Sequence, residues 1–335
     1  MVLLVDTTAK ITQTAIECGL IHANNCINVK SVMAKKNVRI ILNPSAGSKN
    51  PPLRILNNLF QKANVEWDLV ITKDRCDGIC LAEQCVKDGV DIVAAYGGDG
   101  TVMEVASGLH GSGIPMAILP GGTGNILSVE LGIPQDIQEA CALITDPKKS
   151  IIRSIDLGIT NDEKIPAFAL RAGVGLEAAM LEGTDRELKE RYGIFAYIMG
   201  ATQALHNVKE AKYHLVLDGK PVECTGITCL IANAAYFGVP GLTLDPKIKI
   251  DDGLLDVFVL RKMDLADLFS LAAKVVGGNE IKASAFHWQV STVSIESDPI
   301  QSTQADGEMW GESPIEIKAE KDALQVIVPK EKQSK

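Results

Sequence analysis

The sequence is poor in aromatic residues and has no long apolar run. Of its 335 residues only 4% are aromatic, whereas 46% are hydrophobic and 22% are charged, a composition typical of an ordinary soluble globular protein. No apolar run approaches the roughly 20 residues that a membrane-spanning helix needs. The net charge of −9 argues against a broad nucleic-acid-binding surface, because such surfaces are basic. We therefore expect a cytoplasmic protein with no transmembrane segment and no nucleic-acid partner.

Cysteine and histidine patterns typical of metal sites are also missing. The eight cysteines include no C-x2-C pair, and the five histidines form no cluster with metal-ligand spacing. We expect the cysteines to be reduced residues of the core or surface. The first residues have no basic segment before their apolar ones and contain Asp6, which argues against a signal peptide.

Strand-like and helix-like segments alternate in the first half of the chain. The strand-like segments are 38–42, 66–72, 91–96 and 116–119, and the helical segments are 52–63, 77–88 and 101–110. Alternation of this kind predicts a parallel sheet with helices on both faces.

The pattern changes after about Ser150. Short segments of alternating polarity follow one another, separated by Gly, Asp, Asn and Pro, and two helical stretches interrupt them at 178–205 and 265–276. Such segments predict an antiparallel β-sandwich. We expect four parts: an N-terminal extension outside the fold or a short helical appendage, a parallel-sheet domain, the sandwich, and a charged tail. Their limits are 1–36, 37–150, 151–330 and 331–335.

Three loops rich in glycine or small residues follow predicted strands. They are NPSAGSKN at 43–50, GGDGT at 97–101 and PGGTGN at 120–125. Ligands of open parallel sheets bind at the carboxyl ends of the strands, where backbone N–H groups and helix N-termini suit phosphates. The sequence contains no G-x-x-x-x-G-K-[ST] motif and no G-x-G-x-x-G in a first βα turn, which excludes two common nucleotide sites. We expect a nucleotide site of another type.

An aspartate lies in the middle of the second loop. The carboxylate of Asp99 would repel phosphate unless Mg²⁺ or ordered water lay between them. The alternative is a turn aspartate that accepts nearby backbone N–H groups. Thr101 and Glu104 likewise fit either a nucleotide site or a capping box at the start of the next helix.

Several segments carry a family resemblance. They are NPSAG at 43–47, GGDGTVMEVASGL at 97–109, LPGGTGNILSVELGIP at 119–134, AGVGLEA at 172–178, IKIDDGLLDVFVL at 248–260 and TQADGEMW at 303–310. In this order they resemble the diacylglycerol kinase and bacterial lipid kinase superfamily, which includes sphingosine and ceramide kinases. The resemblance covers about 36–329 and implies an NAD-kinase-like α/β domain, the diacylglycerol kinase catalytic domain, followed by a β-sandwich that completes the active site. Two departures are Ala46, where Ser or Gly is frequent, and Glu177, where many relatives carry Asp.

The resemblance implies ATP and Mg²⁺ as cofactors. The implied ATP-binding residues lie in the three loops and at one strand end: Asn43, Pro44, Ser45, Ala46, Gly47, Thr72, Gly97, Gly98, Asp99, Gly100, Thr101, Val102, Met103, Glu104, Gly122, Thr123 and Asn125.

The resemblance also implies a cation site and a base. The cation site consists of the Asp252 side chain with the main chain of Lys249 and Leu254, and it resembles a structural Mg²⁺ site. Glu308 is implied as the proton acceptor, with Asp306 as the competing base. Without the resemblance, the segments around Asp252 and Glu308 are equally consistent with plain turns.

The resemblance implies an ATP- and Mg²⁺-dependent lipid kinase of phospholipid metabolism, acting on diacylglycerol or a related lipid alcohol such as a sphingoid base. One alternative is an NAD kinase, which shares GGDGT but should carry an Asn-Glu pair soon after it. The only such pair, at 279–280, lies far downstream. Another alternative is a non-catalytic regulator that binds nucleotide or lipid. We expect transient contact with a membrane surface, for which 186–205 is a candidate that a packed helix would explain equally. A homodimer remains open.

Overall fold

The computed structural model describes residues 36–46, 52–161, 166–175, 210–236, 243–261 and 285–330. Contacts divide the chain into Met1–Lys35 and Lys36–Lys335, and the description that follows concerns the second unit. Gly47, Glu177 and the helical stretches expected at 178–205 and 265–276 lie outside the described residues.

The first half of this unit contains the predicted parallel sheet. Its strands β1 (Asn37–Leu42), β2 (Glu66–Ile71), β3 (Ile92–Gly97) and β4 (Met116–Pro120) lie in the order β2-β1-β3-β4. Every residue of β3 and β4 is buried, as expected for strands covered on both faces. The sequence could predict β3 and β4 because each is an apolar run that ends at a glycine loop.

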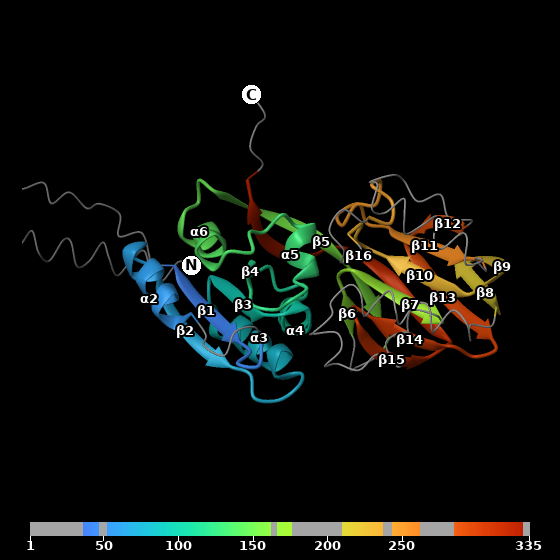
Figure 1. Ribbon diagram of the computed structural model, residues 1–335, viewed down its shortest axis with the longest axis horizontal. Helices are drawn as coiled ribbons and strands as arrows, with labels where there is room; N and C mark the ends of the chain where they lie inside the picture. The colour runs from blue at the N-terminus through green and yellow to red at the C-terminus, as the bar shows by residue number, and fades with distance from the viewer. Residues whose placement is uncertain are drawn as a thin grey trace, which may run out of the picture. The chain divides into compact units, whose positions relative to one another are not determined.

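Helices connect and cover these strands. They are α2 (Leu53–Lys62), α3 (Asp77–Asp88), α4 (Asp99–Leu109), α5 (Ile126–Glu130) and α6 (Ile137–Thr145). Helices α3 and α4 pack together, as do α2 and α6 (Figure 1). Helix α4 begins at Asp99, two residues before the predicted start at 101, so the second glycine loop is shorter than expected.

The second half is built of antiparallel strands, as predicted. One sheet has the order β12-β11-β10-β7-β14-β15, and it faces strands β16, β13, β8 and β9 of the other sheet. In β8 the residues alternate, so that Ala211, Tyr213, Leu215 and Leu217 point into a shared apolar core while those between them face outward. The bounds are β5 (Ser150–Thr160), β6 (Ala167–Phe168), β7 (Arg171–Gly175), β8 (Ala211–Leu217), β9 (Lys220–Gly226), β10 (Thr228–Ala232), β11 (Leu255–Leu260), β12 (Ala285–Val290), β13 (Thr292–Asp298), β14 (Ser302–Ala305), β15 (Glu308–Glu312) and β16 (Ile315–Pro329).

The last strand connects the two halves. Strand β16 pairs along most of its length with β5 and also meets β4, where Val326 lies beside Met116 in parallel register. The parallel sheet and one sandwich sheet are therefore parts of a single ten-stranded sheet (Figure 1). The sequence pattern of β16 gave no indication that it would reach the first half of the chain.

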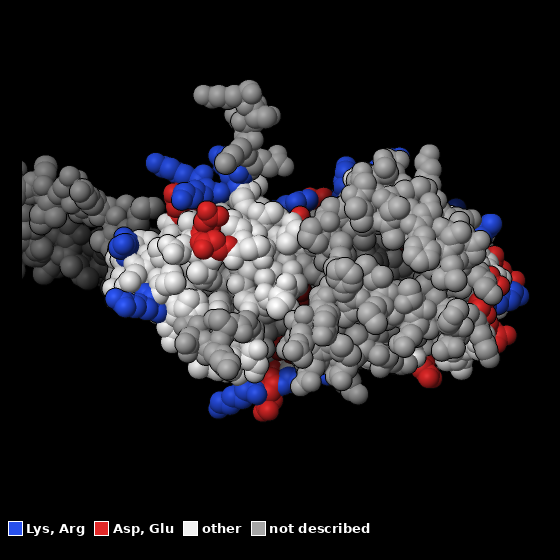
Figure 2. Space-filling model, viewed as in Figure 1, with Lys and Arg blue, Asp and Glu red and all other residues white. Residues whose placement is uncertain are grey.

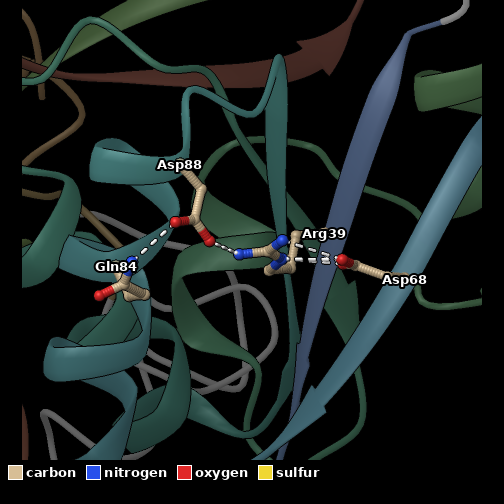
Figure 3. A network of polar contacts seen from close by, with 4 residues as sticks. All are labelled: Arg39, Asp68, Gln84 and Asp88. Atoms are coloured by element: carbon tan, nitrogen blue, oxygen red, sulfur yellow. Dashed lines mark hydrogen bonds and ion pairs between the residues drawn. The ribbon is translucent and has the colours of Figure 1, made fainter.

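A polar network holds α3 against the parallel sheet. Arg39 of β1 donates from Nε to Asp68 of β2 at 2.9 Å and forms an ion pair with Asp88 of α3 (Figure 3). The bond from Arg39, with a second one from Gln84, holds the pKa of the Asp88 carboxyl below its usual range. Because Asp88 is the last residue of α3, this network fixes the end of the helix that is remote from the glycine loops.

Surface charge is distributed in small groups. On the face drawn in Figure 2, Lys and Arg of the described residues lie in separate clusters, with Asp and Glu between them. None of the helices in the described ranges is both long and apolar enough to cross a bilayer.

Candidate functional site

The three predicted loops meet at the carboxyl edge of the parallel sheet. The N–H of Asn43 donates to the carbonyl of Tyr96 at 3.0 Å, and the N–H of Gly121 donates to the carbonyl of Gly97 at 2.9 Å. A Cβ added to Gly122 would lie 2.6 Å from the Cα of Gly98, a distance at which only glycine fits. The backbones of the second and third loops therefore touch, and the N-termini of α4 and α5 open beside them.

The first loop and the end of β2 lie at the same edge. The N–H of Ser45 donates to Asn43 Oδ1 at 2.9 Å, and the N–H of Ala46 donates to the Asn43 carbonyl at 3.2 Å, so Asn43 organises the turn through Pro44. Thr72, directly after β2, is buried and donates its N–H to the carbonyl of Leu42 at 3.0 Å.

The remaining predicted nucleotide residues differ in exposure. Val102 is 3% exposed and belongs to the core, whereas Met103 lines the groove described below. Thr123 and Gly100 are exposed. Asn125 adopts a positive φ of 48° before α5 and accepts the N–H of Gly122 at 3.0 Å, which closes the third loop.

Asp99 joins the second loop to the third. As the first residue of α4 it accepts, through Oδ1, the N–H of Ile126 at 2.6 Å and the N–H of Leu127 at 3.4 Å. Burial raises the pKa of this carboxyl, and the N–H groups of α5 oppose the shift. The bonds to backbone N–H groups that the sequence left as an alternative are therefore present, and they cap α5. The other oxygen, Oδ2, faces Gly124.

Glu104 does not form a capping box with Thr101. Helix α4 begins at Asp99 with Gly98 as its N-cap, and no side chain caps it. Glu104 instead reaches the start of α3, where it accepts the N–H of Cys76 and that of Gly78, both at 3.0 Å. The Thr101 hydroxyl accepts from the side-chain amide of Asn43 at 2.9 Å. The capping-box alternative was wrong because the helix starts two residues earlier than its pattern suggests.

Cys76 is strained by its position before α3. Its φ is 68°, in the left-handed region that favours glycine. We expect Cys76→Gly to raise the free energy of unfolding by about 1 kcal/mol, because the left-handed region costs a side chain about that amount. Chemical denaturation measures the change. The matched control is Cys80→Gly, also exposed but inside α3, which should lower stability by about 1 kcal/mol; a loss of stability in both variants would contradict the account.

The β14–β15 hairpin brings Asp306 and Glu308 to the glycine loops. The Asp306 carboxylate accepts the N–H groups of Ala169 at 2.8 Å, Leu170 at 3.0 Å and Arg171 at 2.8 Å. Burial raises its pKa to about 6, although these bonds oppose the shift. Three donors occupy the oxygens of this carboxylate. Asp306 therefore anchors the hairpin to the segment that begins at Ala169.

Glu308 has a different environment. It is the first residue of β15, its side chain is half exposed, and it forms an ion pair with Arg75. Its Oε1 would lie 3.9 Å from a Cβ added to Gly100. Of the two competing carboxylates, Glu308 is therefore the one that faces the second glycine loop without bonds to the backbone of its own domain.

A groove separates the hairpin from α3 and α4. Arg75, Glu104 and Glu308 are among its polar lining residues, and Ile79 and Met103 are among its apolar ones. An apolar wall beside an available carboxylate suits an alcohol on an apolar body.

The predicted cation residues lie near a buried carboxylate that the sequence did not reveal. Asp156 of β5 is fully buried, accepts the N–H of Gly253 at 2.5 Å through Oδ2, and accepts the N–H of Asp322 at 2.9 Å through Oδ1. Burial raises its pKa, and the charges of Asp322 and Asp252 add to the shift. Asp252 itself accepts the N–H of Leu254 at 3.0 Å.

The groups around Asp252 are of the kind that binds Mg²⁺. Oxygen ligands and an excess of negative charge suit a hard cation, and carboxylates gather around the turn that contains Asp252. No cluster of three His, Cys, Asp or Glu side chains with metal-site geometry occurs in the described part of the chain. A cation held by one carboxylate and by main-chain oxygens, as predicted for Asp252, Lys249 and Leu254, requires no such cluster.

The sequence also did not predict the hydrogen bonds of Glu130 and Asn233. Glu130, the last residue of α5, accepts the N–H of Tyr236 at 2.7 Å, and burial followed by the charge of Asp99 raises the pKa of the Tyr236 hydroxyl. The buried Asn233 donates to the carbonyls of Asp156 at 2.9 Å and Ala169 at 2.8 Å. Each contact joins segments far apart in the chain, so no local pattern could reveal it.

Comparisons with known proteins agree with this arrangement. Residues 37–159 match the model of the diacylglycerol kinase catalytic domain, and residues 171–328 match the YegS C-terminal NAD kinase beta sandwich-like domain. An uncharacterised protein of Synechocystis is 32% identical over 324 residues, which cover 90% of this chain and 72% of that protein. The diacylglycerol kinase of Bacillus subtilis is 27% identical over 305 residues, which cover 89% of this chain and 98% of that protein.

A solved structure shows the same fold. A diacylglycerol kinase of Bacillus anthracis superposes with a TM-score of 0.70 at 25% identity, covering 88% of this chain and 97% of that one. Together the two matched domains extend over most of Lys36–Lys335, the unit that carries the glycine loops and the hairpin. The resemblance seen in the sequence is confirmed: the chain belongs to the diacylglycerol kinase family of lipid kinases.

Proposed function

We propose that the protein transfers the γ-phosphoryl group of ATP to the hydroxyl of a membrane lipid, either diacylglycerol or a related lipid alcohol such as a sphingoid base. The observation that carries the proposal is the position of Glu308, whose Oε1 lies beside Gly100 at the glycine-loop edge. A phosphate site and a candidate base for an alcohol are thus neighbours, which in-line phosphoryl transfer requires.

The chain's own groups divide the work. Backbone N–H groups of the three loops and the N-terminus of α4 hold the phosphates. Asn43, bonded to Thr101, fixes the first loop against α4. Asp99 would hold Mg²⁺, directly or through water, and the cation would supply positive charge against the phosphates. Glu308 accepts the proton of the attacking hydroxyl.

A second Mg²⁺ would stabilise the fold and take no part in catalysis. The Asp252 side chain and the main chain of Lys249 and Leu254 would hold Mg²⁺ beside the buried Asp156. The cation would offset the negative charge of the turn that precedes β11.

The two domains have different roles in the reaction, which takes place at a membrane surface. Residues 37–150 bind ATP, and residues 151–330 supply the base and complete the active site. The lipid substrate lies in a membrane, so the protein acts from the cytoplasm and meets the membrane surface transiently.

Transfer of label tests the function. The protein is incubated with Mg²⁺ and γ-labelled ATP, together with diacylglycerol, a sphingoid base, ceramide, polyprenol or NAD in separate reactions. We expect one of the lipid alcohols to give a labelled lipid phosphate that organic solvent extracts. Diacylglycerol is the acceptor that we expect to be labelled. Label in NADP alone would identify an NAD kinase instead. Nucleotide binding with no labelled product from any acceptor would favour the non-catalytic regulator.

A further inference from the structure

One ion pair crosses the groove between the two halves of the site. Arg75, from the loop between β2 and α3, pairs through Nη2 with Oε2 of Glu308, which lies 233 positions away in the sequence. The two side chains are 71% and 50% exposed. Pairs as exposed as this contribute little to folding stability, so stability alone gives no reason for a contact across the groove.

The backbone that carries Arg75 is held firmly on both sides. Asp77 Oδ2 accepts the N–H of Lys73 at 2.8 Å and the N–H of Asp74 at 3.0 Å. Glu104 accepts the N–H of Cys76 at 3.0 Å. The arginine is therefore presented from a fixed turn and not from a loop tip that moves freely.

The backbone that carries Glu308 is anchored equally well. The Asp306 carboxylate accepts three consecutive N–H groups from the segment that begins at Ala169. The N–H of Gly307 donates to Gln304 Oε1 at 2.9 Å. Two rigid supports thus face each other, and the guanidinium and the carboxylate meet between them.

The charged residues that line the groove are mostly negative, and the ion pair partly offsets their charge. Glu104, Asp306 and Glu308 are carboxylates of its lining, and Arg75 is the one cation among the described lining residues. Bound phosphates would add more negative charge beside Glu308. An unpaired Glu308 side chain, half exposed as it is, would be repelled toward solvent and away from the acceptor.

We propose that Arg75 is a positioning residue that binds one oxygen of Glu308 and thereby directs the other at the second glycine loop. The ion pair uses Oε2, and it leaves Oε1 beside Gly100, where it can take the proton of the lipid hydroxyl. This role rests on the proposed function, in which Glu308 is the base. In this role Arg75 acts through Glu308 and not on the phosphates.

A double-mutant cycle separates this role from the other roles of an arginine near phosphate. Labelled-phosphate assays give kcat and the KM for ATP of the wild type, Arg75→Gln, Glu308→Gln and the double variant. We expect Arg75→Gln to lower kcat about tenfold to a hundredfold, because misplaced reacting groups cost that much. The KM for ATP should stay within about twofold of the wild-type value, and the double variant should be no slower than Glu308→Gln alone.

Two further variants complete the test. Arg75→Lys should recover much of the lost kcat, because it restores a cation at the same place. Lys73→Gln removes the same charge from the same loop, at a residue that is not among those lining the groove, and should leave kcat unchanged.

The outcomes distinguish the failure of this role from the failure of the proposed function. Equal losses from Arg75→Gln with and without Glu308 would contradict the proposal, and so would a raised KM for ATP with normal kcat or wild-type turnover in Arg75→Gln. Full turnover in Glu308→Gln would instead remove the base from the proposed function, and the role of Arg75 would fall with it.

Discussion

Asp99→Asn should slow phosphoryl transfer by about a hundredfold to a thousandfold while the protein stays folded. The asparagine oxygen can still accept the N–H of Ile126 that Asp99 accepts at 2.6 Å, so the cap of α5 survives. The variant loses the charge that the proposed function assigns to the cation and the phosphates. Loss of one preorganised electrostatic group in an active site typically costs this much in kcat. Initial rates with labelled ATP measure the effect, and thermal unfolding tests the fold.

Asp99→Ala is the matched comparison, because it removes both the charge and the cap. It should be as slow as Asp99→Asn and should also lose about 1 kcal/mol of stability, the usual value of a lost helix cap. Turnover near that of the wild type in a folded Asp99→Asn protein would show that the charge of Asp99 has no role, and Asp99 would then be only the cap of α5.

Glu308→Gln should lower kcat by about a hundredfold to ten thousandfold, the range of a general base, with little change in stability. The side chain is half exposed, and its polar contact is the ion pair with Arg75, so the fold depends little on it. Activity across a range of ATP concentrations should show the loss in kcat and not in the KM for ATP.

The neighbouring carboxylate should respond in the opposite way. Asp306→Asn would turn an amide toward N–H groups that Asp306 now accepts from Ala169, Leu170 and Arg171. Leaving one buried donor unsatisfied costs about 1–3 kcal/mol, so this variant should lose stability. A stable but inactive Asp306→Asn protein together with a fully active Glu308→Gln protein would reverse the assignment of base and anchor.

Local patterns in the sequence were sufficient for much of the fold. Helix α3 has the predicted limits 77–88, and β3 and β4 are apolar runs bounded by glycine loops. The start of α4 was missed because Gly98 serves as its N-cap with no side-chain bond that would mark it. The pairing of β16 with β4 was missed because strand partners depend on the whole sheet, and the alternation within one strand does not identify them.

In the site, too, local patterns revealed some features, and contacts between distant residues were missed. The glycine loops were recognisable because the close approach of the two loop backbones demands glycine at Gly122, and the resemblance indicated Glu308. Arg75 and Asp156 were missed, since their partners Glu308 and Gly253 lie 233 and 97 positions away. Glu104 was assigned to the wrong helix for a similar reason: it caps α3, which precedes its own helix in the chain.

The most direct test of the account is a crystal structure with Mg²⁺ and a non-hydrolysable ATP analogue. Its central claim is that the phosphates lie over the glycine loops and the N-terminus of α4, with the terminal phosphate between Gly98–Gly100 and Glu308. Density for the phosphates at this position, with Glu308 still paired to Arg75, is the predicted result. Phosphates bound elsewhere, with residues 97–101 turned away from them, would contradict the claim.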